Sequence, residues 1–140
     1  MKKRVVITGE GSISPLGHNT KSLWESLVKG NSGIDYISGF NTENFSVKIA
    51  GEVKSFEPIN FFDAKEARKL DRFTMFSLIA ASQALKSSNY NFSEAGVIVG
   101  TGVGGMHTLE EEHQKLLNKG QRGVSPCLLY TSDAADDGVG

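Results

Sequence analysis

Three kinds of residue in this chain have types and spacings that could do chemistry: a glycine-rich loop, a few thiol and imidazole groups, and a cluster of cations. The loop, Gly100–Gly105, has the G-x-G-x-x-G spacing of dinucleotide sites and lies between an expected strand and an expected helix. The acidic residue that holds a ribose should follow about 20 residues later after a second strand, and residues 120–126 offer neither. A nucleotide-binding oxidoreductase domain is therefore one alternative. The other is structural, because the glycines here and at residues 9–11 permit sharp turns and close packing.

The one thiol and the three imidazoles lack partners that would complete a catalytic or metal set. Cys127 directly follows Pro126 and has no elbow of small residues around it, so it does not look like a nucleophile. His113 follows Glu110 at helical spacing, but a carboxylate-bridged metal site needs a second Glu-x-x-His pair from another helix. The sequence therefore predicts no metal site and places His113 on a solvated helix face.

Four cations are spaced so that one face of a short helix would carry them all: Lys65, Arg68, Lys69 and Arg72. Their i, i+3, i+4 and i+7 spacing predicts a basic stripe. Two interpretations are open. The stripe is either a solvated face whose charges pair locally with Glu66 and Asp71, or a docking surface for an acidic partner.

The elements that would position these residues follow from hydrophobic periodicity and from capping signals. We expect strands at 5–8, 47–53 and 95–99, and helices at 20–30, 64–70, 71–87 and 106–118. Thr20, Asp63 and Asp71 are the predicted N-caps of the first three helices. The helix at 71–87 is apolar nearly all round, which predicts that it lies deep in the core. The order β-α-β-α-α-β-α indicates a layered α/β sheet.

Length and composition are those of one globular domain, with 140 residues, of which 39% are hydrophobic and 22% charged. Fifteen basic and sixteen acidic residues give a net charge of −1, so no overall field favours nucleic acid or an anionic membrane. A single Cys excludes an internal disulfide and favours a reducing compartment. No apolar run forms a signal-peptide core or approaches the roughly 20 residues of a membrane span, so we expect a cytoplasmic protein.

A series of blocks, in the same order, resembles the β-ketoacyl-acyl carrier protein synthases, and among them the elongating, type II branch. The blocks are RVVITGEG (4–11), SPLG (14–17), LWESL (23–27), GNSGI (30–34), AGEV (50–53), KEARKLDRF (65–73), VGTGVGGM (99–106) and VSP (124–126). The resemblance implies the first half only of a thiolase-like α/β fold, over residues 1–126. Half of such a fold leaves an apolar face uncovered, so we expect the chain to fold poorly by itself.

The chemistry implied by the resemblance is a decarboxylating Claisen condensation that needs no cofactor. In the family, a Cys takes the acyl group from acyl carrier protein. Two His then help a malonyl thioester lose carbon dioxide and attack the acyl group, which gives 3-oxoacyl-acyl carrier protein. These residues, and the central strand of the family's homodimer, correspond to positions beyond Pro126. Because Cys127 does not match the pattern, we expect no catalytic residue in this chain, no activity and no dimer.

The residues that can still carry function are assigned from the same resemblance. Lys65, Arg68 and Lys69 match the basic residues on which the family docks acidic acyl carrier protein. Leu109 matches a bulky apolar residue of the acyl pocket, whose size limits chain length; plain core packing is the alternative. A non-catalytic module that binds carrier protein is therefore a third possible function.

The last fourteen residues, 127–140, do not resemble the family. They resemble the translated read-through of a sequencing adapter, and we hypothesise that they are not native sequence. If so, they should form a poorly packed tail.

Overall fold

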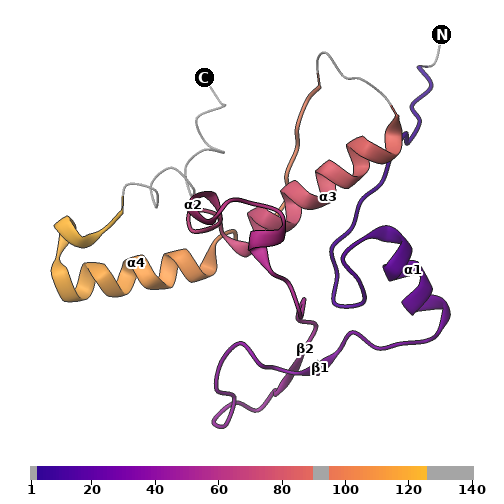
Figure 1. Cartoon of the computed structure of the whole chain (residues 1–140). Coiled ribbons are helices and arrows are strands. Elements are labelled where there is room, and N and C mark those ends of the chain that lie inside the picture. The colour runs from indigo at the N-terminus through magenta and orange to yellow at the C-terminus, as the bar shows by residue number, and fades with distance from the viewer. Residues whose placement is uncertain (1–2, 90–94, 126–140) are drawn as a thin grey trace.

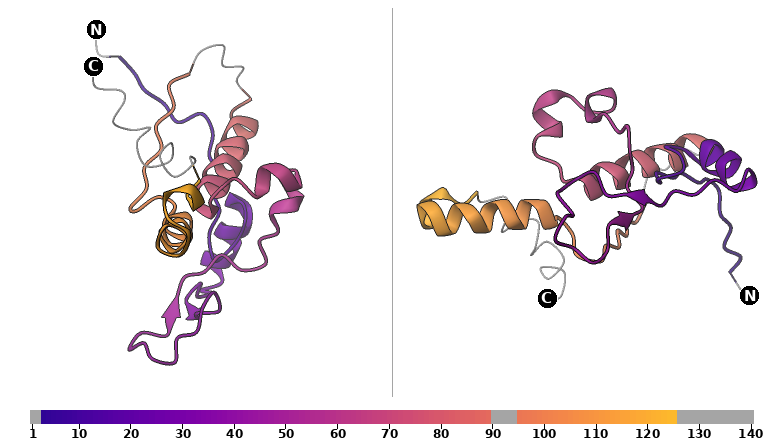
Figure 2. Two further views of the ribbon diagram at one scale, coloured as in Figure 1. Left: turned by 90° about the vertical axis from the view of Figure 1, so that its left-hand side faces the viewer. Right: turned by 90° about the horizontal axis from the view of Figure 1, so that it is seen from below.

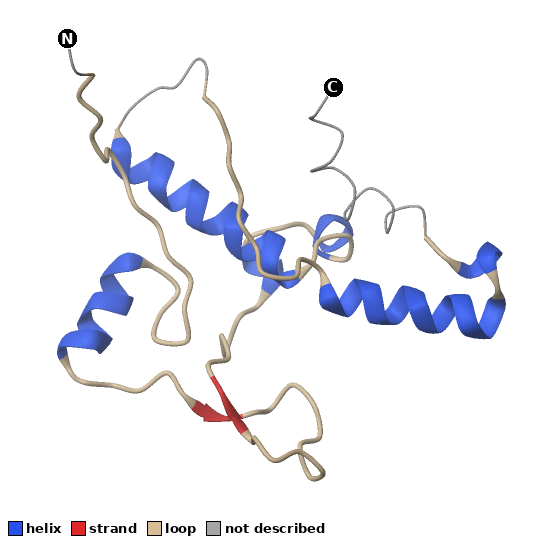
Figure 3. Ribbon diagram, turned by 180° about the vertical axis from the view of Figure 1, so that it is seen from behind, coloured by secondary structure: helices blue, strands red, loops and turns tan. Residues whose placement is uncertain are grey.

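The computed structural model describes residues 3–89 and 95–125. Its elements in chain order are α1 (Thr20–Val28), β1 (Asp35–Tyr36), β2 (Ile49–Ala50), the 3-10 turn η1 (Pro58–Asn60), α2 (Ala64–Ala67), α3 (Arg72–Ser88), α4 (Met106–Lys119) and the 3-10 turn η2 (Gln121–Gly123). Helix α3 runs through the middle, with α1 and the β1–β2 pair to one side of it and α4 extending away on the other (Figure 1). Long loops connect these elements (Figure 3).

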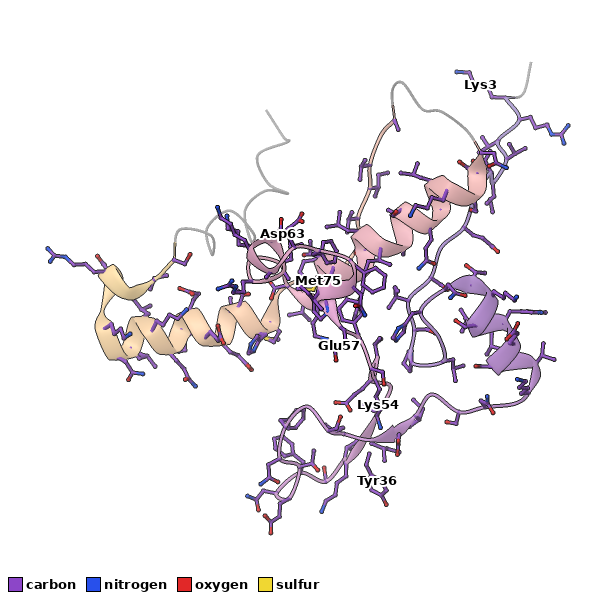
Figure 4. All side chains as sticks on the ribbon, viewed as in Figure 1. Lys3, Tyr36, Lys54, Glu57, Asp63 and Met75 are labelled. Carbon is purple, nitrogen blue, oxygen red and sulfur yellow. The ribbon has the colours of Figure 1, made fainter. Side chains whose placement is uncertain are left out.

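A small hydrophobic core lies against the first half of α3. Its buried members are Phe56, Met75 and Ile79, and partly buried apolar side chains surround them, among them Ile13 and Phe76. The ring of Phe56 meets that of Phe76 edge to face, with centroids 5.0 Å apart. Met75 lies near the start of α3 (Figure 4). The core therefore joins a loop, the N-terminal segment and one stripe of α3.

The helices begin close to the residues that the sequence predicts. Asp63 caps α2, since its carboxylate accepts hydrogen bonds from the backbone N–H groups of Lys65 and Glu66. Helix α1 is capped by Asn19 and not by Thr20, which is the first helical residue. The reason is a reciprocal capping box, in which the Asn19 side chain accepts from the Ser22 N–H and the Ser22 hydroxyl faces the Asn19 N–H.

The predicted strands are mostly wrong for this structure. Residues 5–8 and 95–99 are extended but form no ladder within the described ranges, and their side chains are exposed, to 91% for Val5 and 99% for Ile98. Of the predicted strand at 47–53, only β2 remains, paired antiparallel with β1 so that Tyr36 faces Ile49. A strand needs a partner to satisfy its backbone, and neither extended segment finds one in the described chain. The layered sheet is thus absent from this part of the chain.

Helix α3 is less buried than its sequence predicts. Only Met75 and Ile79 are buried among its residues, whereas Leu78 and Leu85 are about half exposed. An apolar helix lies deep in a core only when layers cover it on several sides, and here one stripe is covered. Seen from below, α4 continues the long axis of the molecule and does not fold back over α3 (Figure 2).

The glycines at 9 and 11 bring the N-terminal segment against the backbone of α3. A Cβ at Gly9 would overlap the carbonyl oxygen of Ala84, and one at Gly11 the carbonyl oxygen of Ala80. The contact is completed by hydrogen bonds to side chains of α3, including Glu10 N to Ser87 Oγ at 2.9 Å. The close packing predicted for these glycines is confirmed, although the segment that approaches the helix is an unpaired one and not a strand of a sheet.

A carboxylate organises the loop that joins β1 to β2. Glu52 accepts hydrogen bonds from the N–H and hydroxyl of Ser38 and from the N–H of Gly39. The Ser38 N–H, then its hydroxyl, lower the pKa of Glu52 from its ordinary value of 4.5. Nearby, Lys54 Nζ pairs with Asp35 at 2.6 Å in an exposed position (Figure 4).

Replacing Gly11 by Ala should destabilise the chain, because the added methyl would meet backbone atoms that cannot move aside cheaply. We expect a loss of about 1–3 kcal/mol in the free energy of unfolding, measured by urea denaturation and circular dichroism. Gly100→Ala is the matched control, since a Cβ there faces open space. Equal unfolding midpoints for the two variants would contradict the packing of residues 9–11 on α3.

The Glu52 contacts should weaken in acid. Because the folded pKa is lowered, the stabilisation is complete above the ordinary pKa of 4.5 and is lost as pH falls through the lower, folded value. The Ser38 amide resonance, followed by NMR from neutral pH downward, should titrate with a midpoint below 4.5. In Glu52→Gln this titration should vanish. A midpoint at or above 4.5 in the unaltered chain would contradict the assigned hydrogen bonds.

Candidate functional site

Three exposed cations lie in and just after helix α2, where the chain turns towards α3. Lys65 is within the capped helix, Arg68 is its C-cap and Lys69 lies in the turn that follows. The Arg68 Nε donates to the carbonyl of Ala64 at 2.9 Å, which directs its guanidinium along the helix end. We refer to Lys65, Arg68 and Lys69 as the basic stripe.

Arg72, predicted to lie on the same face, does not belong to the stripe. Helix α2 ends at Ala67, and Arg72 opens a separate helix. Its guanidinium lies 5.1 Å from the ring centre of Phe76 and 5.5 Å from that of Phe56, and donates to the carbonyl of Val53 at 2.8 Å. The single four-cation face is therefore wrong, because the intervening turn rotates Arg72 towards the core.

The local ion pairs expected for a solvated face are also absent from the described residues. None of the three cations of the basic stripe lies within 4.0 Å of a carboxylate oxygen there. Glu66 and Asp71 were the expected partners, but the Asp71 carboxylate instead accepts a hydrogen bond from the Thr108 hydroxyl at 2.7 Å. The stripe thus presents three positive charges to solvent.

A cavity of about 700 Å³ separates the basic stripe from the start of helix α4. Arg68 and Lys69 border it on one side, and His107 and Thr108 border it on the other. Figure 1 shows α4 beginning beside the first turn of α3. Residues 67–69 and 104–108, which belong to the two regions that the sequence singled out, therefore border one cavity.

Leu109, the predicted pocket residue, lies on the first turns of α4 and is 50% exposed. It lines a separate cavity of about 210 Å³ together with Leu116 and Val124. The cavity is mainly apolar, since these side chains form most of its wall. Its size and lining are compatible with a short apolar group, and the role of Leu109 stays a prediction.

A buried carboxylate, which the sequence analysis did not single out, fixes the chain beyond α4. Glu112 accepts from Lys115 Nζ at 2.6 Å and from the Ser125 backbone N–H. The Lys115 hydrogen bond, then that of Ser125, lower the pKa of Glu112, and the same pair raises the pKa of Lys115. Glu and Lys three residues apart on a helix are the one sequence signal that pointed to this pair.

In the glycine-rich loop, Gly105 is in close contact with another segment, whereas a Cβ at Gly100, Gly102 or Gly104 would meet open space. Gly104 has a positive φ of 74°, and a Cβ at Gly105 would overlap the Asp71 carboxylate. That carboxylate lies at the N-terminus of α4, where the pyrophosphate of a dinucleotide would have to bind. A negative charge at this place argues against the nucleotide-binding alternative.

Two of the three histidines have polar contacts, and His113 is exposed. His18 Nε2 lies 3.0 Å from the carbonyl oxygen of Lys54, and His107 pairs with Glu111 one turn later. His113 borders the small cavity at Leu109. Within residues 3–89 and 95–125, no group of three His, Cys, Asp or Glu side chains could hold a metal ion. Cys127 and the tail at 127–140 lie outside the described residues.

No helix in the described ranges is long and apolar enough to span a membrane.

Comparison with known proteins connects this geometry to one family. Residues 2–136 match the family described as "Beta-ketoacyl synthase, N-terminal domain". The chain is 46% identical over 132 residues to 3-oxoacyl-[acyl-carrier-protein] synthase 2 of Staphylococcus aureus (strain COL), covering 91% of this chain and 32% of that protein. The synthase of the same name from Vibrio cholerae is 43% identical over 133 residues. The chain thus spans about a third of the length of these relatives.

Solved structures show the same fold class. The ishigamide ketosynthase/chain length factor matches with a TM-score of 0.71 and 28% identity, over 89% of this chain and 32% of that one. A type II polyketide ketosynthase solved in complex with its acyl-carrier protein matches equally well, with a TM-score of 0.71 and 23% identity over 93% of this chain and 35% of that one. The thiolase-like fold class is thereby confirmed, although the strands at 5–8 and 95–99 are unpaired here. The chain belongs to the β-ketoacyl synthase family, and its matched part is the N-terminal domain of that family.

Proposed function

We propose that this chain is the N-terminal part of a 3-oxoacyl-acyl carrier protein synthase of fatty-acid elongation, and that the basic stripe is its docking surface for acidic acyl carrier protein. The identity of 46% to a synthase named for that partner supports the assignment. The observation that carries it is the presence of three exposed cations on one short segment, without carboxylate partners among the described residues. We further propose a cytoplasmic location for this enzyme.

The chain is proposed to contribute docking and part of the acyl pocket, and not the bond-making groups. By resemblance, the Cys that accepts the acyl chain and the two His that assist decarboxylation correspond to positions beyond Pro126. The 140-residue chain should therefore bind carrier protein without condensing acyl groups. Binding without turnover is also what a non-catalytic carrier-protein module would show, so finding the remaining catalytic sequence in the gene would separate these two functions.

Residues 127–140 are proposed not to be native sequence. Sequencing the source gene through the codons after Pro126 should give a different continuation, which includes a Cys in a small-residue elbow and two later His. A gene that reads as the present sequence through Gly140 would overturn this proposal, and one that also ends there would overturn the assignment of enzymatic activity.

Reversing charges on the basic stripe should weaken carrier-protein binding. Lys65→Glu with Lys69→Glu places two negative charges where an acidic partner would dock, and electrostatic attraction sets the association rate and register of such complexes. We expect the dissociation constant of the 140-residue chain for acyl carrier protein, measured by titration calorimetry or NMR, to rise roughly tenfold or more at low salt. The difference should shrink as ionic strength increases.

The matched control is Lys21→Glu with Lys29→Glu, which makes the same change in net charge at two exposed lysines in and beside α1. It should leave the dissociation constant nearly unchanged. Equal weakening by both double variants would mean that only net charge matters, and an unchanged constant for the stripe variant would refute the docking surface.

A further inference from the structure

The side chain of Asp71 contacts helix α4, although Asp71 is the N-cap residue of helix α3. It stands in the N-cap position of α3, two residues after the end of the basic stripe, yet its side chain makes no capping hydrogen bond to α3. Its Oδ1 instead accepts from the Thr108 hydroxyl at 2.7 Å, across 37 residues of sequence. The carboxylate therefore connects the α2–α3 turn to the first turn of α4.

Helix α4 has no cap of its own and needs one. Its N-cap residue is Gly105, which has no side chain to offer, and its first turn contains no acidic residue. The unpaired N–H groups and the positive end of the helix dipole make this turn a favourable place for a carboxylate. Asp71 lies against Gly105 so closely that a Cβ there would overlap it. A distant residue thus places a carboxylate at the N-terminus of α4, where the Thr108 hydroxyl holds it.

The same turn presents the predicted pocket residue. Leu109 follows Thr108 directly, and its backbone N–H donates to the carbonyl of Gly105 at 3.0 Å. Any displacement of Thr108 or Gly105 therefore moves Leu109. On the other side, Asp71 is separated from Lys69 by Leu70 alone, so a shift of the basic stripe is transmitted to the carboxylate through two peptide units.

We propose that Asp71 is a positioning residue that couples the docking surface to the acyl pocket: it holds the start of α4, and with it Leu109, at a place set by the α2–α3 turn. This inference rests on the proposed function for its docking partner. Binding of an acidic partner to Lys65, Arg68 and Lys69 orders the turn, and the Asp71–Thr108 hydrogen bond carries that order into α4. The amide of Leu109 then becomes a reporter of docking.

We call the Asp71–Thr108 hydrogen bond, which holds α4 to the α2–α3 turn, the tether. Amide hydrogen exchange of the 140-residue chain tests the tether without any partner. Asp71→Ala should speed exchange at the Leu109 amide roughly tenfold to a hundredfold, as expected when a hydrogen bond to a charged group is removed. Thr108→Val, which keeps the shape but loses the donor, should do the same. Thr108→Ser, which keeps the hydroxyl, should restore slow exchange, a rescue that mere loss of packing would not give.

Asp35→Ala is the matched control, because the Asp35 carboxylate also accepts a charged hydrogen bond, from Lys54, and its hydrogen bonds in the described residues do not reach α4. It should leave exchange at Leu109 unchanged. Fast exchange at Leu109 in the unaltered chain, or equal rates in the unaltered chain and in Asp71→Ala, would overturn the tether.

Addition of acyl carrier protein tests the coupling. In the unaltered chain it should slow exchange at Leu109 several-fold, whereas Asp71→Ala should bind with a similar dissociation constant and show no slowing. Equal slowing in both would overturn the coupling while leaving docking intact. If acyl carrier protein does not bind the unaltered chain, the proposed function and the coupling to that partner are both refuted. The exchange rates measured without partner would still show whether the tether exists.

Discussion

Burial of one stripe of helix α3 against Phe56 is the interaction on which the rest of the structure depends. Met75 and Ile79 provide the stripe, and Arg72 covers the aromatic rings beside it with its guanidinium. The N-terminal segment packs along the same helix through Gly9 and Gly11. Asp71 lies at the start of α3, directly after the turn that follows α2, and it bonds Thr108 of α4. The positions of α2 and α4 therefore depend on how α3 packs against the core.

Because the core is built on one helix, many apolar side chains of the described residues are exposed to solvent. Val5, Ile7 and Ile98 extend almost fully into solvent, and α1 exposes Trp24 and Val28. Exposed large apolar side chains in such numbers are unfavourable in water and are usually found where another element packs. Within residues 3–89 and 95–125 the core has three buried side chains, which is small for this length and agrees with the expectation that half of a two-layer fold is poorly stable by itself.

The elements that the sequence predicted well are those that local interactions determine. The helices at α1, α2, α3 and α4 were predicted to within a few residues because capping residues and apolar spacing act over one or two turns. The strands at 5–8 and 95–99 have the correct β-branched composition, but a strand forms only with a partner, and pairing is decided far along the chain. The sequence pattern therefore identified segments able to form strands without showing whether they pair.

The same distinction between local and long-range interactions applies to the residues of the candidate site. Exposure of Lys65, Arg68 and Lys69 follows from their polar character and local spacing, so the sequence could locate them. The departure of Arg72 depends on where α2 ends, a boundary that sequence patterns place only to within a few residues. The Asp71–Thr108 contact joins residues 37 positions apart, and no local sequence pattern predicts such a pair.

That contact also explains how a carboxylate can lie next to the basic stripe without neutralising it. Asp71 is three residues from Arg68, a spacing at which opposite charges attract on a helix, so the two would be expected to pair. Here the uncapped N-terminus of α4 competes for the same carboxylate, and it offers a hydroxyl donor together with the positive end of a helix dipole. One hydrogen bond thus has two effects: it stabilises the helix that presents Leu109, and it leaves the three cations of the stripe available to an acidic partner.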